Sequence, residues 1–182
     1  TNNYNGKIDL TYKVSDGNGG STNASNSFSL ATVNDNPALT GSKASLANGT
    51  EDTTYTIKAS DLLKGYTDAD GDSQSVTSLT ATNGSLSNQG NNTWLFTPTN
   101  NYNGKVDLTY KVSDGNGGSI NASNSFALAS VNDKPVLTGS KASLADGTED
   151  NSYTIKSSDL LSGFTDADGD SLSITNLTAT NG

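Results

Sequence analysis

The chain repeats itself with a period of 98 residues. The segment that opens at Thr1, TNNYNGKIDLTYKVSDGNGGS, returns at Thr99 as TNNYNGKVDLTYKVSDGNGGS. Residues 1–84, aligned with 99–182, share 69 identities and differ at 15 positions. A unit of this length is too long for a helical solenoid repeat and has the size of a whole domain. The sequence therefore predicts a string of similar domains rather than one large domain.

Apolar residues alternate with polar ones inside each repeat. Between Lys7 and Val14 every second residue is apolar, which is typical of a half-buried strand. Four further segments behave in the same way: 27–33, 54–58, 75–81 and 93–97. A single helical turn is expected at 60–63, capped by Ser60 or Asp61, with Asp159 as the cap in the second copy. The pattern predicts an all-β sandwich.

Two polar segments that contain proline set the domain boundaries. They are Asn34-Asp35-Asn36-Pro37 and Asn132-Asp133-Lys134-Pro135, and each follows a predicted strand, as a linker does. The boundaries predict one complete domain at 34–131. Residues 1–33 then supply the closing strands of a preceding repeat, and 132–182 form the opening part of the next.

Composition excludes several classes of function. The net charge is −9, and an acidic chain repels nucleic acid and anionic membrane surfaces, so neither is an expected partner. No apolar stretch is long enough to span a bilayer, so no direct membrane insertion is expected. The absence of Cys and His removes thiol nucleophiles and imidazole bases. A polysaccharide-active enzyme with paired carboxylates needs a general acid in a pocket. The Asp residues of this chain instead crowd into turns that are expected to be exposed, so no enzyme is expected.

The densest acidic cluster is DADGD, which contains Asp68, Asp70 and Asp72 and recurs with Asp166, Asp168 and Asp170. At about 4 Å and an effective dielectric near 20, each carboxylate pair would cost roughly 4 kcal/mol. A hard cation reverses that repulsion, and a set of oxygen ligands selects calcium or magnesium. Calcium is the expected ion, because magnesium tends to keep its bound waters. The loop is not an EF-hand, because Gly71 falls at position 4 where that motif has its glycine at position 6, Leu79 occupies position 12 in place of Glu, and the flanks are predicted strands. A solvated turn is the alternative, since Asp and Gly favour turns.

Glutamate occurs once in each repeat, as Glu51 and Glu149, and both lie in Gly-Thr-Glu-Asp. A bidentate calcium ligand is a good reason to use Glu at one place only.

The motifs together resemble a known family. NDNP, a lone Glu 16 residues after Asp35, an Asp-x-Asp loop and a strand ending in Ser-Asp-Gly resemble, in that order, a cadherin repeat. GTED, DLLxGFTDADGD, TATNG, FTPxxNYNG and LTYxVSDGNGGS resemble the cadherin-like, immunoglobulin-like tandem repeats of giant bacterial RTX-type adhesins. The resemblance covers the whole chain. It implies seven-stranded β-sandwiches of 98 residues joined end to end, with calcium at each junction.

The resemblance also implies a set of calcium ligands. The linker ligands would be Asn34, Asp35, Asn132 and Asp133. The Asp-x-Asp ligands would be Asp68, Asp70, Asp166 and Asp168, with Asp72 and Asp170 within reach. The strand-ending ligands would be Asp114 and, in the preceding unit, Asp16. The ligands at the lower end of a domain would be Glu51 and, in the next copy, Glu149.

The sequence departs from the cadherin pattern in two places. Residues 100–104 are Asn-Tyr-Asn-rich where cadherins carry a second acidic motif, so a junction should bind fewer ions or bind them more weakly. Lys134 stands where the first linker has Asn36.

The expected function is that of an extender on the bacterial cell surface, outside the cell. Its partners would be neighbouring repeats of the same chain, stiffened by calcium, while the adhesion target binds elsewhere in the full protein. The alternative is that the repeats themselves bind glycans or other cells. That alternative needs an exposed aromatic patch, but the spacing of Trp94, Phe96, Tyr12 and Tyr110 predicts that these rings belong to the core.

Overall fold

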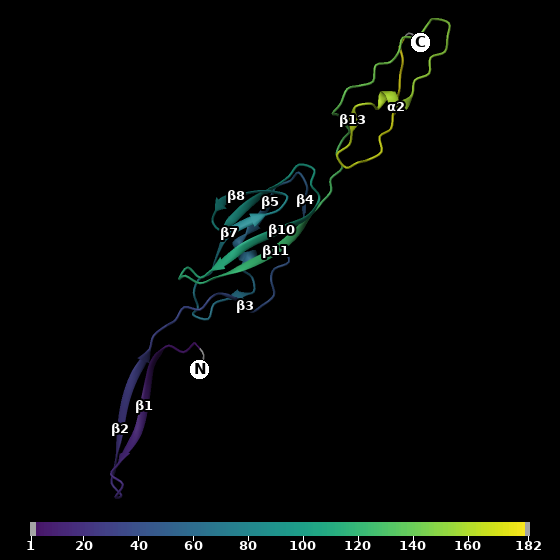
Figure 1. Cartoon of the computed structure of the whole chain (residues 1–182). Helices are drawn as coiled ribbons and strands as arrows, with labels where there is room; N and C mark the ends of the chain where they lie inside the picture. The colour runs from purple at the N-terminus through teal and green to yellow at the C-terminus, as the bar shows by residue number, and fades with distance from the viewer. Residues whose placement is uncertain (1–2, 181–182) are drawn as a thin grey trace.

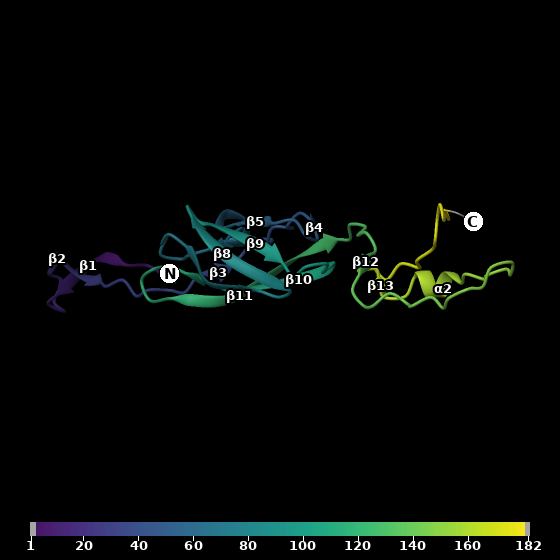
Figure 2. The same cartoon turned by 90° about the horizontal axis from the view of Figure 1, so that it is seen from above.

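The computed structural model describes residues 3–180. These residues form an elongated molecule of three parts arranged end to end (Figures 1 and 2). An N-terminal hairpin, a central β-sandwich and a C-terminal part follow one another along the long direction, and a short linker joins each pair. In the described residues no helix is long and apolar enough to cross a membrane.

The central part is a sandwich of a four-stranded and a three-stranded sheet. The first sheet has the order β4 (Gly49–Thr50), β11 (Ser119–Ala129), β10 (Gly104–Ser113) and β7 (Ser75–Ala81). The second has the order β5 (Tyr55–Lys58), β9 (Thr93–Pro98) and β8 (Gly84–Gly90). A short ribbon pairs β3 (Ala38–Leu39) with β6 (Tyr66–Thr67). The predicted all-β sandwich is confirmed.

The core of the sandwich follows the alternation in the sequence. Val106, Leu108, Tyr110 and Val112 of β10 are at most 3% exposed, because every second residue of the strand faces inward. They pack with Phe96 and Phe126, whose rings meet edge to face with centroids 5.5 Å apart. The apolar and aromatic positions of this domain are therefore core, as predicted.

The N-terminal hairpin pairs β1 (Gly6–Ser15) with β2 (Ser21–Leu30). Its register equals that of β10 and β11 shifted by one repeat, since Gly6 pairs with Leu30 as Gly104 pairs with Leu128. In each copy the tyrosine before the first strand donates a hydrogen bond from its hydroxyl to the backbone three residues on. The apolar face of this hairpin is uncovered. Tyr12, expected in a core, is 49% exposed because no second sheet faces it.

The C-terminal part contains β12 (Val136–Leu137), α2 (Ser157–Leu160) and β13 (Phe164–Thr165). Residues 153–156 and 173–179, which correspond to β5 and β7, form no strands here. In the central domain those strands pair with β9 and β10 respectively, whereas residues 132–180, the described residues of the C-terminal part, include no strands equivalent to β9 or β10.

Two local predictions were wrong. Strand β8 was missed because Ser, Asn, Gln and Gly fill it, so it carries almost no apolar alternation. The helical turn exists as α1 (Ala59–Leu62), but its N-cap is Lys58, without a side-chain cap bond. Asp61 and Asp159 instead lie in the first turn of α1 and α2, where their negative charge interacts favourably with the positive end of the helix dipole.

Candidate metal centre

The acidic loop of the central domain directly follows β6. Carboxylate oxygens of Asp68, Asp70 and Asp72 all lie within 4.8 Å of one another. Asp68 Oδ1 accepts hydrogen bonds from the backbone N–H of Asp70 at 2.9 Å and of Asp72 at 3.4 Å, which folds the loop back on the first carboxylate. Gly71 has φ +80° and so permits the tight turn.

The first linker is hydrogen-bonded to this loop and to the neighbouring one. The backbone N–H of Asp35 donates to Asp70 Oδ2 at 2.7 Å. Asn34 Nδ2 donates to Asp114 Oδ2 at 2.8 Å. Asn116, in the loop that joins β10 to β11, donates from Nδ2 to Asp72 Oδ2 at 2.7 Å. The strand-ending Asp, the linker and the acidic loop are thus brought together, as the resemblance implied.

Asp114 is 4% exposed, and its carboxylate is surrounded by hydrogen-bond donors. The side chain of Asn34, and then the backbone N–H groups of Asn116 and Gly118, hold the pKa of Asp114 below its ordinary value against the opposing effect of burial. Asp114 is therefore held in its charged form at the first junction.

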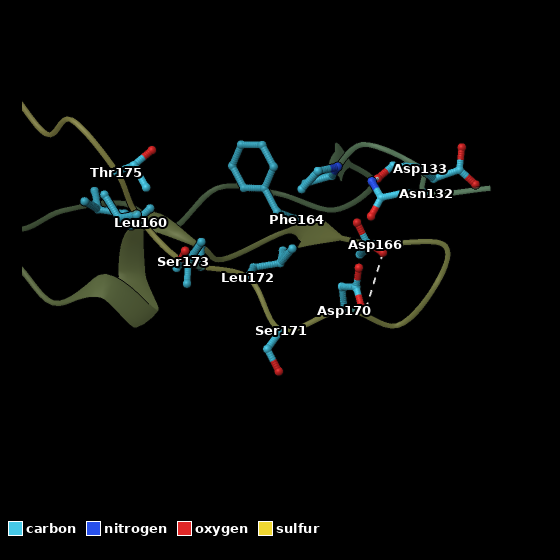
Figure 3. Close-up of a pocket in the computed structure, with 13 residues that line it drawn as sticks. Asn132, Asp133, Leu160, Phe164, Asp166, Asp170, Ser171, Leu172, Ser173 and Thr175 are labelled. Carbon is cyan, nitrogen blue, oxygen red and sulfur yellow. Dashed lines mark hydrogen bonds between the residues drawn. The ribbon is translucent and has the colours of Figure 1, made fainter. Parts of the chain in front are cut away.

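The second junction repeats the first in its linker and acidic loop. The backbone N–H of Asp133 donates to Asp168 Oδ2 at 2.7 Å, the same contact and length as in the first linker. Asp166 Oδ1 accepts from the N–H of Asp168 and, at 3.3 Å, from that of Asp170. Figure 3 shows Asn132 and Asp133 beside Asp166 and Asp170.

Glu51 supplies a carboxylate from the lower end of the central domain. It is 1% exposed, and its Oε1 accepts a hydrogen bond of 2.6 Å from the backbone N–H of Val131. Its position is set by β4, which runs parallel to β11 and pairs Thr50 with Ala129. The backbone N–H of Glu51 continues that pairing to the carbonyl of Ala129 at 3.0 Å.

Three buried carboxylate oxygens have no hydrogen-bond partner within residues 3–180: Glu51 Oε2, Asp68 Oδ2 and Asp133 Oδ2. A buried polar atom without a partner costs about 1–3 kcal/mol, and more when it is charged. Such atoms are rare in native proteins and need a partner, such as a water molecule or a bound ion.

The acidic groups of the second junction repel one another. Burial first, and then the negative charges of Asp52, Asp168, Glu51 and Asp166, raise the pKa of Asp133. These groups come from the lower end of the central domain, the linker and the loop of the next part. All three segments therefore contribute negative charge at this junction.

The chemistry of this group fits calcium. The candidate ligand atoms are carboxylate oxygens and the side-chain amide oxygen of Asn132. Asp166, Asp168 and Asp170 form one acidic cluster, and Glu51 and Asp133 each add an oxygen that has no partner within residues 3–180. Calcium takes six to eight such ligands in a flexible geometry. A doubly charged cation would turn the mutual repulsion into attraction.

Two predicted ligands lie outside these clusters. Asp16 is at the tip of the N-terminal hairpin, and its side chain accepts from Asn18 and Gly20 of its own loop, each at 2.9 Å. Glu149 is exposed, and its carbonyl accepts from Asn151 Nδ2 at 3.2 Å. Each is one repeat away from a residue that does lie at a junction, Asp114 and Glu51 respectively.

Sequence reasoning missed three residues. Asp52 acts on Asp133 and is held by the N–H of Asn101, which donates to Asp52 Oδ1 at 2.9 Å. Its presence in both copies of Gly-Thr-Glu-Asp was an available signal. For Asn116 the sequence offered no signal beyond its place directly after Ser-Asp-Gly. Asn36 Oδ1 accepts from the N–H of Ser119 at 3.0 Å, which ties the linker to the hairpin loop. Lysine has no acceptor, so Lys134 cannot repeat that contact.

Comparison with known proteins matches the chain to the cadherin-like domain over residues 33–129 and again over 131–182. No curated protein matches it. Among solved structures, endo-fucoidan hydrolase MfFcnA4 of glycoside hydrolase family 107 aligns at 22% identity and a TM-score of 0.36, over 68% of this chain and 19% of that one. MfFcnA9 of the same family aligns at 20% identity and a TM-score of 0.33, over 67% and 22%. The chain spans about a fifth of the length of these proteins.

Proposed function

Given that the chain belongs to the cadherin-like domain family, we propose that it is a structural calcium-binding extender of a bacterial cell-surface adhesin. The cadherin-like domain is a non-enzymatic fold and is generally extracellular. The RTX-adhesin part of the proposal rests on the motifs GTED, DLLxGFTDADGD and LTYxVSDGNGGS in their order along the chain.

The observation that carries the proposal is the set of unpartnered carboxylate oxygens at the second junction. Glu51 offers a free oxygen from one domain, and Asp133 offers one from the linker. Residues of the next part complete the group. The residues that would hold the ion here are Glu51, Asn132, Asp133, Asp166, Asp168 and Asp170. At the first junction they would be Asn34, Asp35, Asp68, Asp70, Asp72 and Asp114. Calcium would supply the positive charge that these groups lack.

The domain organisation belongs to the same proposal. Residues 34–131 form one complete repeat, 1–33 the closing hairpin of the repeat before it, and 132–182 the opening part of the repeat after it. An ion shared by two neighbours favours one interdomain angle, because its ligands come from both. A string of such junctions forms a stiff rod that holds distal binding domains away from the cell.

Calorimetry on the whole chain tests calcium binding. A ligand at 100 times its dissociation constant adds about 2.7 kcal/mol to the free energy of unfolding, so calcium should raise the melting temperature of the central domain above its value in chelator. Magnesium at the same concentration is the control and should act more weakly, since it dehydrates reluctantly. Equal melting temperatures in calcium and chelator would contradict the proposal.

A further inference from the structure

Residues 34–131 contain four Asn-Gly dipeptides, which begin at Asn48, Asn83, Asn103 and Asn116. Asparagine is chemically labile before glycine, because the backbone nitrogen of a residue without a side chain can reach the amide carbon of the asparagine. The attack requires that this nitrogen is free and that the glycine can move. The reactivity of each dipeptide therefore depends on where its glycine lies in the fold.

Three of the four glycines are fixed in sheets. Gly49, Gly84 and Gly104 are the first residues of β4, β8 and β10. Gly49 and Gly104 both pair with Leu128 of β11. A Cβ at Gly84 would lie 2.4 Å from Phe96 Cζ, so this strand end is also tightly packed. These three peptide groups have little room to reach the geometry of attack.

The fourth glycine, Gly117, lies in the open loop between β10 and β11. Its φ is +109°, and apart from its chain neighbours no heavy atom lies within 4 Å of the place that a Cβ would take. The N–H groups on either side are engaged, since Asn116 and Gly118 donate to Asp114 Oδ1 at 2.8 and 2.9 Å. The N–H of Gly117 donates to no acceptor within the described residues 3–180. The attacking nitrogen is therefore free.

The side chain of Asn116 is exposed, yet it is held at the metal centre of the first junction. Its Nδ2 donates at 2.7 Å to Asp72 Oδ2, and Asp72 belongs to the acidic cluster with Asp68 and Asp70. A group formed from this amide therefore arises beside a predicted calcium ligand.

We propose that Asn116 is a site of spontaneous deamidation, and that the product adds a carboxylate to the first junction. The backbone nitrogen of Gly117 loses its proton to solvent and bonds to Asn116 Cγ, while the Cγ–Nδ2 bond breaks and ammonia leaves with a proton from water. The succinimide ring takes up one water molecule, which breaks either bond from the ring nitrogen to a carbonyl carbon. The products are aspartate and isoaspartate, each with one new carboxylate, and nothing is oxidised or reduced.

The product reverses the electrostatics at Asp72, and this step rests on the proposed calcium function. In the unreacted chain Asp72 Oδ2 accepts a hydrogen bond from an amide, whereas after the reaction two carboxylates face each other. Without a cation they repel, so the loop should be less stable in chelator. With calcium the new carboxylate is a further oxygen ligand, and the number of charged ligands tunes calcium affinity. Deamidation thus makes the first junction more dependent on calcium.

The same loop occurs one repeat earlier. Residues 16–20 are identical to 114–118, and the N–H groups of Asn18 and Gly20 donate to Asp16 Oδ1, each at 2.9 Å. Asn18 should therefore deamidate as Asn116 does. The reactive loop occurs once per repeat, so a string of such repeats would change at every junction.

Peptide mapping by mass spectrometry, on the whole chain incubated at mildly alkaline pH, tests the modification. Deamidation raises the mass of a peptide by about one dalton, and the two reactive loops lie in peptides of different sequence. Conversion should be fast at Asn116 and Asn18, and slow at the three asparagines whose glycines begin strands. Asn116→Gln is the control and should stay unmodified at this position, because glutamine must close a larger ring.

Calcium titration by calorimetry on Asn116→Asp, which reproduces the aspartate product, tests the consequence. This variant should bind calcium severalfold more tightly than the unchanged chain and should melt at a lower temperature in chelator. Asn88→Asp adds the same charge on β8, away from the acidic loop. Asn88 Oδ1 accepts from the N–H of Gly90 at 2.8 Å, a hydrogen bond that aspartate keeps. This control should leave the calcium affinity unchanged.

The two halves of the proposal fail separately. Conversion at Asn116 no faster than at Asn48, Asn83 and Asn103 would overturn the modification, whatever the titration gives. Unchanged calcium affinity in Asn116→Asp, in a chain that does bind calcium, would overturn the consequence alone. No calcium binding in either the unchanged chain or the variant would contradict the calcium function and with it the consequence, while the mass spectra would still decide the modification.

Discussion

The backbone N–H of Val131 donates a 2.6 Å hydrogen bond to Glu51 Oε1, and the second oxygen of that carboxylate is buried and has no partner among the residues that the structure describes. One oxygen therefore holds the end of β11 to the lower end of the domain, while the other is available to a ligand. Because the two oxygens belong to one carboxylate, Glu51 links the edge of the central sandwich to the junction that follows it.

Two substitutions at Glu51 separate these two roles. Glu51→Gln keeps an acceptor for Val131 and removes the charge, so the melting temperature in chelator should not fall, but calcium should no longer raise it. Glu51→Ala also leaves the N–H of Val131 without its acceptor, which costs about 1–3 kcal/mol of unfolding free energy. Scanning calorimetry checks both. A full calcium response in Glu51→Gln would show that this carboxylate does not face the ion.

Asp133 gives a pH dependence of definite sign. Its pKa is raised in the folded protein, so the ionised form is penalised there. In chelator the penalty is absent below the unfolded pKa and grows as the pH rises from the unfolded to the folded pKa. Lowering the pH through that interval should therefore stabilise the second junction.

Asp133→Asn should remove that dependence and stabilise the calcium-free junction, while weakening the response to calcium. Hydrogen exchange of residues 131–136 as a function of pH measures this effect. The exposed residue Asp146 supplies the control, Asp146→Asn. A calcium-free junction that opens further in Asp133→Asn would refute the assignment.

Position 118 requires glycine because the side chain of Asp114 occupies the space that a Cβ would need, not because of its backbone angles. A Cβ at this position would lie 2.0 Å from Asp114 Oδ2, and one at Gly20 would lie 2.3 Å from Asp16 Oδ2. Gly118→Ala should push Asp114 out of its contact with Asn34 and reduce calcium affinity at the first junction. Gly20→Ala makes the same change on the free hairpin and should leave that affinity unchanged in the monomer. Calcium titration by calorimetry distinguishes them, and equal losses in both would count against a role for Asp114.

The repeat supplies a matched pair of phenylalanines. Phe126 is 4% exposed and stacks on Tyr55 with centroids 4.2 Å apart, whereas Phe28, at the same repeat position, is 50% exposed. Phe126→Ala should lower the free energy of unfolding of the central domain by about 3–5 kcal/mol. Phe28→Ala should change it by less than the error of denaturant unfolding. Similar losses in both variants would mean that the hairpin is already covered in the monomer.

The sequence predicted the sandwich because its strands alternate strictly, as Lys105 to Val112 does in β10, and because the repeat fixed the length of a domain. Strand β8 was not predictable in this way, since a polar edge strand is held by backbone bonds to β9 rather than by an apolar face. The exposure of Tyr12 could not be predicted from the sequence either. Burial depends on what lies opposite a strand, and two hairpins that are nearly identical in sequence have different surroundings here.

The acidic loops and linkers of the candidate site were predictable because carboxylates crowd into short segments. Asp52 was passed over because it sits beside a more conspicuous Glu. The roles of Asn116 and Asn36 come from contacts 44 and 83 residues apart in the chain, which local sequence does not reveal.

The distance across the second junction tests the central claim most directly. The chain contains no cysteine, so spin labels can be placed at Ser87→Cys in the central domain and Ser158→Cys in the C-terminal part. Pulsed electron paramagnetic resonance should give one narrow distance distribution in calcium and a broad one in chelator. The same distribution under both conditions would contradict the account.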